Sequence, residues 1–209
     1  MVFPGCVYIS QATEYGTLYT LAELEAIRKV CTKYDMPLFI DGARLGYALT
    51  ATGNDVTLED IARIADVFYI GGTKVGAMFG EAVVFTHGNM PKNFVTLVKQ
   101  HGALLAKGWL LGVQFDTLFT DDLYCRIARH ANDAADRIRE VLVERGYMLT
   151  FDAPTNQIFI TLDNATSERL QRNVRLGFME KADDTHTVMR ICTSWATTDE
   201  QVEQLIALL

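Results

Sequence analysis

The sequence of 209 residues has few of the features that mark metal-binding, disulfide-rich or membrane-spanning proteins. Its four cysteines, Cys6, Cys31, Cys125 and Cys192, form no C-x-x-C pair, and its four histidines form no H-E-x-x-H pattern. No apolar run approaches the roughly 20 residues that cross a bilayer. We therefore expect no metal site and no membrane span. Because apolar residues suffice for a core without disulfides, we also expect four buried free thiols.

Basic residues are also scarce. There are 19 Lys and Arg against 26 Asp and Glu, a net charge of −7, whereas a nucleic-acid-binding protein needs clustered positive charge. The hydrophobic share of 49% and the charged share of 22% exclude a disordered chain. The first residues show no basic segment before an apolar stretch, so we expect no secretory leader and a cytoplasmic location.

The first half of the sequence alternates between strand and helix patterns. Short apolar segments at residues 6–10, 37–40, 67–70 and 81–85 predict strands. Capping-box signatures at Thr20 and Thr57 predict the starts of two helices between them. Such alternation is typical of a parallel or mixed sheet that helices cover on both faces.

The second half predicts a smaller α/β layer. Residues 93–120 are strongly apolar and predict packed helices, and residues 121–145 predict a long amphipathic helix that ends at Gly146. Strands are expected at 157–162 and 187–192, with helices near 167–173 and from Thr198. We expect an α/β fold with one domain over residues 1–120 and a small C-terminal α/β domain over residues 121–209, rigidly coupled because no flexible linker separates them.

Charged residues follow two of the predicted strands, where α/β folds bind ligands. Asp41 and Arg44 follow one strand and Lys74 follows the next, each among small residues that let a planar ligand approach the backbone. Other interpretations stay open. Asp41 could cap a helix with Arg44 as its surface partner. Lys74 could be a solvated loop lysine, or Gly71–Lys74 could hold a phosphate, although Val75 breaks the Walker pattern.

Four motifs resemble those of one enzyme family. They are SQATEYGT at residues 10–17, IDGARL at 40–45, GGTKVG at 71–76 and MRICTSWATT at 189–198. In order and spacing they are similar to the threonine aldolase/β-eliminating lyase family, and the similarity runs essentially end to end. The resemblance implies the aspartate-aminotransferase-like fold of pyridoxal 5'-phosphate (PLP) enzymes, here the C-terminal part of the large domain followed by the small domain.

The resemblance also implies roles for individual residues. Lys74 would form the Schiff base with PLP, which requires a neutral amine on a desolvated lysine. Asp41 would pair with the protonated pyridine nitrogen, and Thr73 would also contact the cofactor. Arg44 would face the cofactor's phenolic oxygen or the substrate carboxylate. Arg190 would bind that carboxylate through its planar fork, unless it is a structural arginine.

The function implied is Cα–Cβ cleavage of a β-hydroxy-α-amino acid such as threonine, giving glycine and an aldehyde. Family members carry more than a hundred further residues ahead of this region, including a Gly-rich loop for the cofactor phosphate. We therefore expect readily lost cofactor and weak activity of this chain alone. Alternatives are β-elimination, transamination, a catalytically silent assembly module, or a non-enzymatic domain that binds a phosphate ligand.

Two further expectations concern the surroundings of the site. Gln11 and Glu14 lie in a loop that, by resemblance, runs near the active site, although a polar surface turn is an equally good interpretation. The apolar segment 94–119 has more large side chains than one helical face can bury, which predicts a homo-oligomer, a dimer or tetramer.

Overall fold

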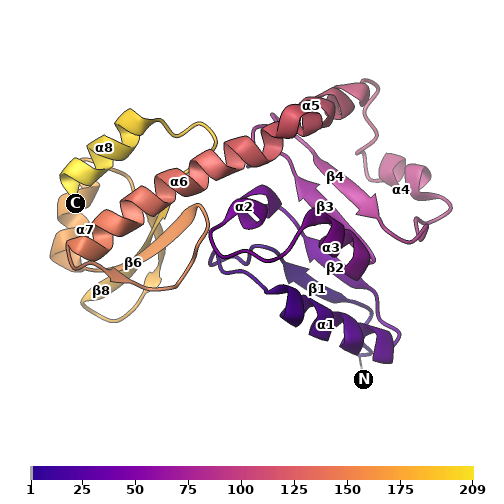
Figure 1. The fold of residues 1–209 in the computed structure, drawn as a ribbon, viewed down its shortest axis with the longest axis horizontal. Helices are drawn as coiled ribbons and strands as arrows, with labels where there is room; N and C mark the ends of the chain where they lie inside the picture. Colours follow the sequence, from indigo (N-terminus) through magenta and orange to yellow (C-terminus); the bar gives the residue numbers. More distant parts are fainter. Residues whose placement is uncertain (1) are drawn as a thin grey trace.

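Two β-sheets, joined by one long helix, organise residues 2–209 in the computed structural model of the protein (Figure 1). The first sheet comprises β1 (Val7–Ser10), β2 (Leu38–Asp41), β3 (Val67–Gly71) and β4 (Glu81–Phe85), in that order. β1, β2 and β3 are parallel and β4 is antiparallel to β3, as expected for a mixed sheet. The second sheet has the order β5-β6-β8-β7 with antiparallel pairs. Its strands are β5 (Met148–Leu149), β6 (Gln157–Asp163), β7 (Gly177–Lys181) and β8 (His186–Cys192).

The predicted helices form, with a few additions. The helices are α1 (Leu21–Lys33), α2 (Leu45–Thr50), α3 (Leu58–Ile64), α4 (Phe94–Gln100), α5 (Trp109–Phe119), α6 (Leu123–Glu144), α7 (Asn164–Gln171) and α8 (Asp199–Leu208). Capping boxes at Thr20, Thr57 and Thr198 open α1, α3 and α8, and each satisfies backbone N–H groups that the first helical turn leaves free. Gly146 follows the end of α6 with a φ of +78°, a conformation that favours glycine.

Helices cover one face of the first sheet. Leu24 of α1, Ile61 of α3 and Tyr47 of α2 are buried there with Ile40 of β2. On the opposite face the rings of Tyr8, Phe39 and Tyr69 form a row across β1, β2 and β3, and Tyr8 is 57% exposed. Among residues 2–209, the expectation that helices cover both faces is therefore met on one face only.

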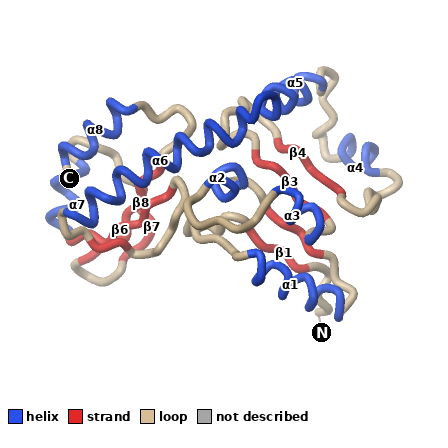
Figure 2. Tube along the Cα trace, in the orientation of Figure 1, coloured by secondary structure: helices blue, strands red, loops and turns tan. Residues whose placement is uncertain are grey.

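The long helix α6 connects the two sheets. Its first half packs Tyr124, Ala128 and Ala131 into the core of the first sheet, and its second half packs Ile138 and Leu142 into the core of the second. Figure 2 shows α6 running between the two groups of strands. The helix α6 therefore contributes side chains to both cores and fixes the position of the second sheet relative to the first.

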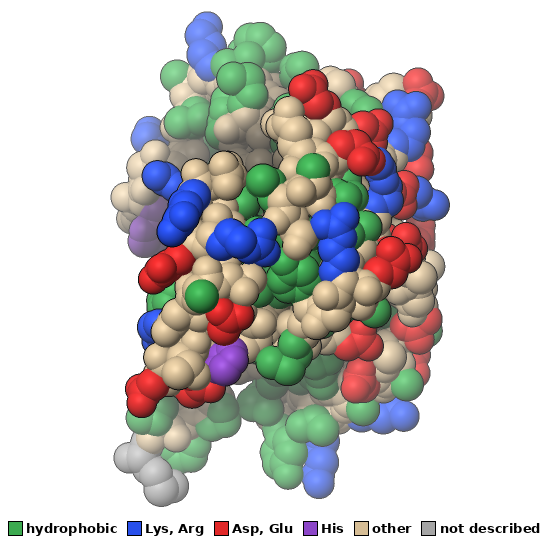
Figure 3. Space-filling view, turned by 90° about the vertical axis from the view of Figure 1, so that its left-hand side faces the viewer, with side chains coloured by type: hydrophobic (Ala, Val, Ile, Leu, Met, Phe, Trp, Pro, Cys, Tyr) green, Lys and Arg blue, Asp and Glu red, His purple; other side chains and the backbone are tan. Residues whose placement is uncertain are grey.

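The surface carries charges of both signs, and the cysteines are unpaired. On the face that carries α7 and α8, basic and acidic side chains are interspersed (Figure 3). All four cysteines are free, as predicted, but only Cys31 is buried. Cys6 and Cys192 are exposed because they lie at strand ends, where the predicted burial is wrong. Among residues 2–209, no helix is long and apolar enough to cross a lipid bilayer.

Candidate active site

Two loops that follow β2 and β3 carry the residues singled out from the sequence. The N–H of Gly71 donates to the carbonyl of Gly42 over 2.9 Å. A Cβ on Gly42 would lie 1.9 Å from the carbonyl oxygen of Tyr69, and a Cβ on Gly71 would lie 2.4 Å from that of Ala43. Only glycine allows this approach of the backbones, which holds the Asp41 and Lys74 loops against each other.

Asp41, at the end of β2, is half-buried and well supplied with hydrogen-bond donors. The Tyr8 hydroxyl donates to Oδ2 and the N–H of Ala43 donates to Oδ1 over 2.9 Å. Burial by itself raises the pKa of the Asp41 carboxyl, but hydrogen bonds to Tyr69 and Tyr8 lower it. The N–H of Ala43 and the charge of Lys74 lower it further, so the pKa of Asp41 lies below the ordinary 3.8. Asp41 is therefore a carboxylate at neutral pH.

Lys74 lies in a tight turn after β3. The N–H groups of Val75 and Ala77 both donate to the carbonyl of Gly72, and the Tyr47 hydroxyl donates to the carbonyl of Lys74. The turn buries Val75 and leaves the Lys74 side chain exposed. The expectation of a desolvated lysine is therefore wrong for the chain as it stands. Its charge nevertheless acts on Asp41, so the two side chains share one region.

Thr73 has a different partner from the one expected. Its hydroxyl donates to Oε1 of Glu81 over 3.2 Å, and the N–H of Gly72 donates to Oε2 of the same side chain over 2.7 Å. Glu81 thereby fixes the loop that precedes Lys74. The contact of Thr73 with a cofactor remains a prediction.

Arg44 forms an ion pair with Glu14. Two nitrogens of its guanidinium donate to the two carboxylate oxygens over 3.1 and 3.3 Å. The Arg44 side chain is largely buried, whereas that of Glu14 is exposed. The loop that carries Glu14 is held by Gln11, whose amide exchanges hydrogen bonds with the backbone of Tyr19. Gln11 thus shapes the loop, and its N–H donates to the carbonyl of Asp41 over 2.9 Å. Glu14 is the residue of the loop whose side chain reaches a predicted site residue.

Arg190 comes from the second sheet. It lies on β8, and its Nη1 donates to Oε1 of Gln157 over 3.2 Å. Nε2 of Gln157 in turn donates to the backbone carbonyl of Glu14 over 3.3 Å. The structure therefore connects Arg190 to Arg44 through Gln157 and Glu14, and brings Asp41 and Lys74 together on the adjacent loops.

Several residues of this region were not anticipated: Tyr8, Tyr69, Glu81 and Gln157. The strand register offered a signal for the tyrosines, because Ser10 pairs with Asp41 and side chains alternate along a strand. Tyr8 therefore lies on the same face as Asp41. No local pattern marks Glu81 or Gln157.

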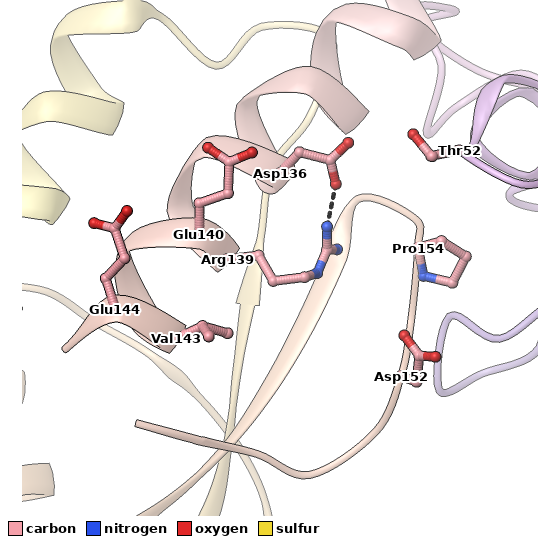
Figure 4. Close-up of a pocket in the computed structure, with 8 residues that line it drawn as sticks. All are labelled: Thr52, Asp136, Arg139, Glu140, Val143, Glu144, Asp152 and Pro154. Carbon is pink, nitrogen blue, oxygen red and sulfur yellow. Dashed lines mark hydrogen bonds and ion pairs between the residues drawn. The ribbon is translucent and has the colours of Figure 1, made fainter. Parts of the chain in front are cut away.

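A cavity of about 820 Å³ lies elsewhere and contains none of the predicted site residues. Figure 4 shows Arg139 pointing toward Asp136, with which it pairs, in a lining that also contains Glu140, Glu144 and Asp152. Arg139 also donates hydrogen bonds to two backbone carbonyls, so it has a structural role. Within the described part of the chain, no group of three or more His, Cys, Asp or Glu side chains is arranged to hold a metal ion.

Solved structures define the fold class. A Thermus thermophilus aspartate aminotransferase superposes with a TM-score of 0.69 at 16% identity, over 98% of this chain and 56% of the other. A threonine aldolase of Leishmania major superposes with a TM-score of 0.96 at 43% identity, over 100% of this chain and 61% of the other. The fold is that of the PLP-dependent, aspartate-aminotransferase-like proteins.

Sequence comparison gives the family. Residues 3–177 match the profile of the Beta-eliminating lyase family, and the chain belongs to that family. A low specificity L-threonine aldolase of Pseudomonas aeruginosa is 32% identical over 203 residues, which is 97% of this chain. A second, from a Pseudomonas species, is 31% identical over 205 residues. The chain spans 58% of the length of each of these relatives.

Proposed function

We propose that the protein is a PLP-dependent lyase that cleaves the Cα–Cβ bond of a β-hydroxy-α-amino acid such as threonine, releasing glycine and an aldehyde. The relatives named threonine aldolase support this reaction. The observation that carries the proposal is the contact of the Gly42 and Gly71 loops, which brings Lys74 close enough for its charge to lower the pKa of the ionised Asp41.

The residues present fit PLP. Asp41 is kept ionised at the end of a strand, as the partner of a protonated pyridine nitrogen must be, and Lys74 offers an accessible amine near it. We propose that Lys74 holds the cofactor covalently, that Thr73 contacts it and that Arg44 faces its phenolic oxygen. When bound, PLP supplies a sink for the electrons that remain at Cα when the bond breaks.

In this scheme the protein's own residues hold the cofactor and bind the substrate. Asp41 keeps the proton on the ring nitrogen, because a fixed carboxylate in a partly dry site opposes its loss. Arg190 binds the substrate carboxylate through its planar guanidinium.

Replacing Arg190 with lysine should raise the KM for threonine by about tenfold and change kcat by less than about twofold, since the charge stays but the bidentate geometry is lost. Steady-state kinetics across threonine concentrations measures this. The matched control is Arg137→Lys, an arginine that pairs with Asp199 and Glu203 away from the site. An unchanged KM in Arg190→Lys would make Arg190 a structural residue.

The function itself is tested by incubating the protein with PLP and threonine and measuring the products. Cleavage of Cα–Cβ gives glycine and acetaldehyde in equal amounts. Formation of ammonia and a 2-oxo acid would identify β-elimination, and a requirement for an added 2-oxo acid would identify transamination. A folded protein that binds PLP and forms none of these products would be a silent module.

We also propose that the protein self-associates through α4, α5 and the segment between them. Trp109 is 62% exposed, and Val95, Leu105, Leu110 and Val113 also expose large parts of their side chains. Exposed apolar side chains gathered on one segment are typical of an interface. A dimer or tetramer is the expected assembly.

The double substitution Trp109→Asp/Leu110→Asp is therefore expected to lower the molar mass in solution to that of the monomer, 23.4 kDa. Size-exclusion chromatography with light scattering measures it. The control Val143→Asp changes an equally exposed apolar residue on α6, 58% exposed, and should leave the assembly intact. A wild-type monomer, or equal effects of the two substitutions, would contradict the proposed interface.

We also propose a cytoplasmic location. None of the four cysteines is paired with another in the described part of the chain, an arrangement typical of proteins in a reducing compartment.

A further inference from the structure

Gln157 is a fully buried polar residue at the start of β6, with 0% of its surface exposed. A buried amide is costly unless it is hydrogen-bonded, and both ends of this one have partners. Nε2 donates to the carbonyl of Glu14 over 3.3 Å. Oε1 accepts from Nη1 of Arg190 over 3.2 Å and, more weakly, from the thiol of Cys192 over 3.8 Å.

The hydrogen bond to Gln157 restrains the Arg190 guanidinium but uses only one of its N–H donors. Among residues 2–209, Gln157 is the one side chain to which Arg190 donates a hydrogen bond. A guanidinium has five N–H donors, so the remaining ones can receive a ligand. Because the acceptor is a neutral amide, it orients the guanidinium without neutralising its charge.

The other end of Gln157 is anchored to a rigid loop. Gly16 of that loop accepts a hydrogen bond from the hydroxyl of Thr155 over 3.0 Å, two residues before Gln157. The same loop presents Glu14, whose carboxylate pairs with Arg44. Gln157 is therefore fixed relative to the first sheet, although it belongs to the second.

We propose that Gln157 is a positioning residue, whose amide oxygen holds the Arg190 guanidinium in the orientation that receives the substrate carboxylate. This inference rests on the proposed function, in which Arg190 binds that group. A carboxylate at position 157 would instead pair with Arg190 and compete with the substrate. An apolar side chain of similar volume would leave Arg190 free to rotate.

Calorimetric titration of the PLP-loaded protein with glycine and with glycinamide tests the proposal, because only glycine carries a carboxylate. In Gln157→Met the dissociation constant for glycine should rise about tenfold, while that for glycinamide changes by less than about twofold. In Gln157→Glu, nearly isosteric with the native residue, the glycine constant should rise further, by about thirtyfold. The KM for threonine should rise in parallel in both variants, with kcat changed by less than about twofold.

The matched control is Gln171→Met, which alters a glutamine of α7 that bonds only to Ser167. It should change neither constant. Equal weakening of glycine and glycinamide in Gln157→Met would show a merely structural role and overturn the inference, as would wild-type affinity for glycine in both Gln157 variants. If the wild-type protein binds neither ligand, the proposed function fails together with the inference.

Discussion

Replacing Lys74 with alanine is expected to abolish the covalent binding of PLP and to lower threonine cleavage by at least about 10³-fold. The reason is that the charge of Lys74 acts on the ionised Asp41, and that Lys74 follows the strand end where the two glycine loops meet. The mass of the intact protein after mixing with PLP and reduction with borohydride, together with an acetaldehyde assay, measures both effects.

Lys29→Ala is the matched control, since Lys29 lies on α1, away from the two loops and from the proposed interface, and is exposed like Lys74. It should retain wild-type cofactor content. If Lys74→Ala still binds PLP covalently, or loses no more of this binding than the control, another residue holds the cofactor and Lys74 is not the attachment site.

Replacing Asp41 with asparagine is expected to lower kcat by about 10- to 150-fold, the equivalent of the 1.5–3 kcal/mol that a charge-assisted hydrogen bond contributes. The amide retains the shape of the side chain but cannot hold a proton on a ring nitrogen. The hydrogen bond from Tyr8 can still form, so the circular dichroism spectrum should not change.

The pH dependence gives a second readout for Asp41. Its pKa is lowered below the ordinary 3.8, so protonation of Asp41 should limit wild-type kcat only below that pH. Asp35→Asn, a carboxylate in the turn after α1, is the matched control and should leave kcat unchanged. Wild-type turnover in a folded Asp41→Asn variant would show that Asp41 does not take part in the reaction.

Local signals in the sequence predicted most of the fold. Thr20, Thr57 and Thr198 each precede an acidic residue or glutamine at the third helical position, and each opens a helix in the structure. The strand β7 was missed because apolar and polar residues do not alternate in its sequence, GFMEK, and three of its five residues are exposed. The helix α2 was missed because it is short and contains Gly46.

The site was predictable only in part. Asp41 and Lys74 stand in motifs next to strand ends, so the sequence points to them directly. Gln157 bonds to Glu14 across 143 positions, and Tyr8 bonds to Asp41 across 33, so neither contact has a local signature. The prediction that Cys6 and Lys74 are buried was wrong for the same reason. Both have apolar or small neighbours in the sequence, but a strand end and a turn expose them in the structure.

The covalent attachment of PLP to Lys74 is the central claim, and one measurement tests it most directly. The protein is mixed with PLP, reduced with borohydride so that the link to lysine becomes permanent, digested and mapped by mass spectrometry. The expected result is close to one PLP per chain on the peptide that contains Gly71–Gly76. Label on Lys92, Lys99 or Lys107, or equal label on several lysines, would contradict the account.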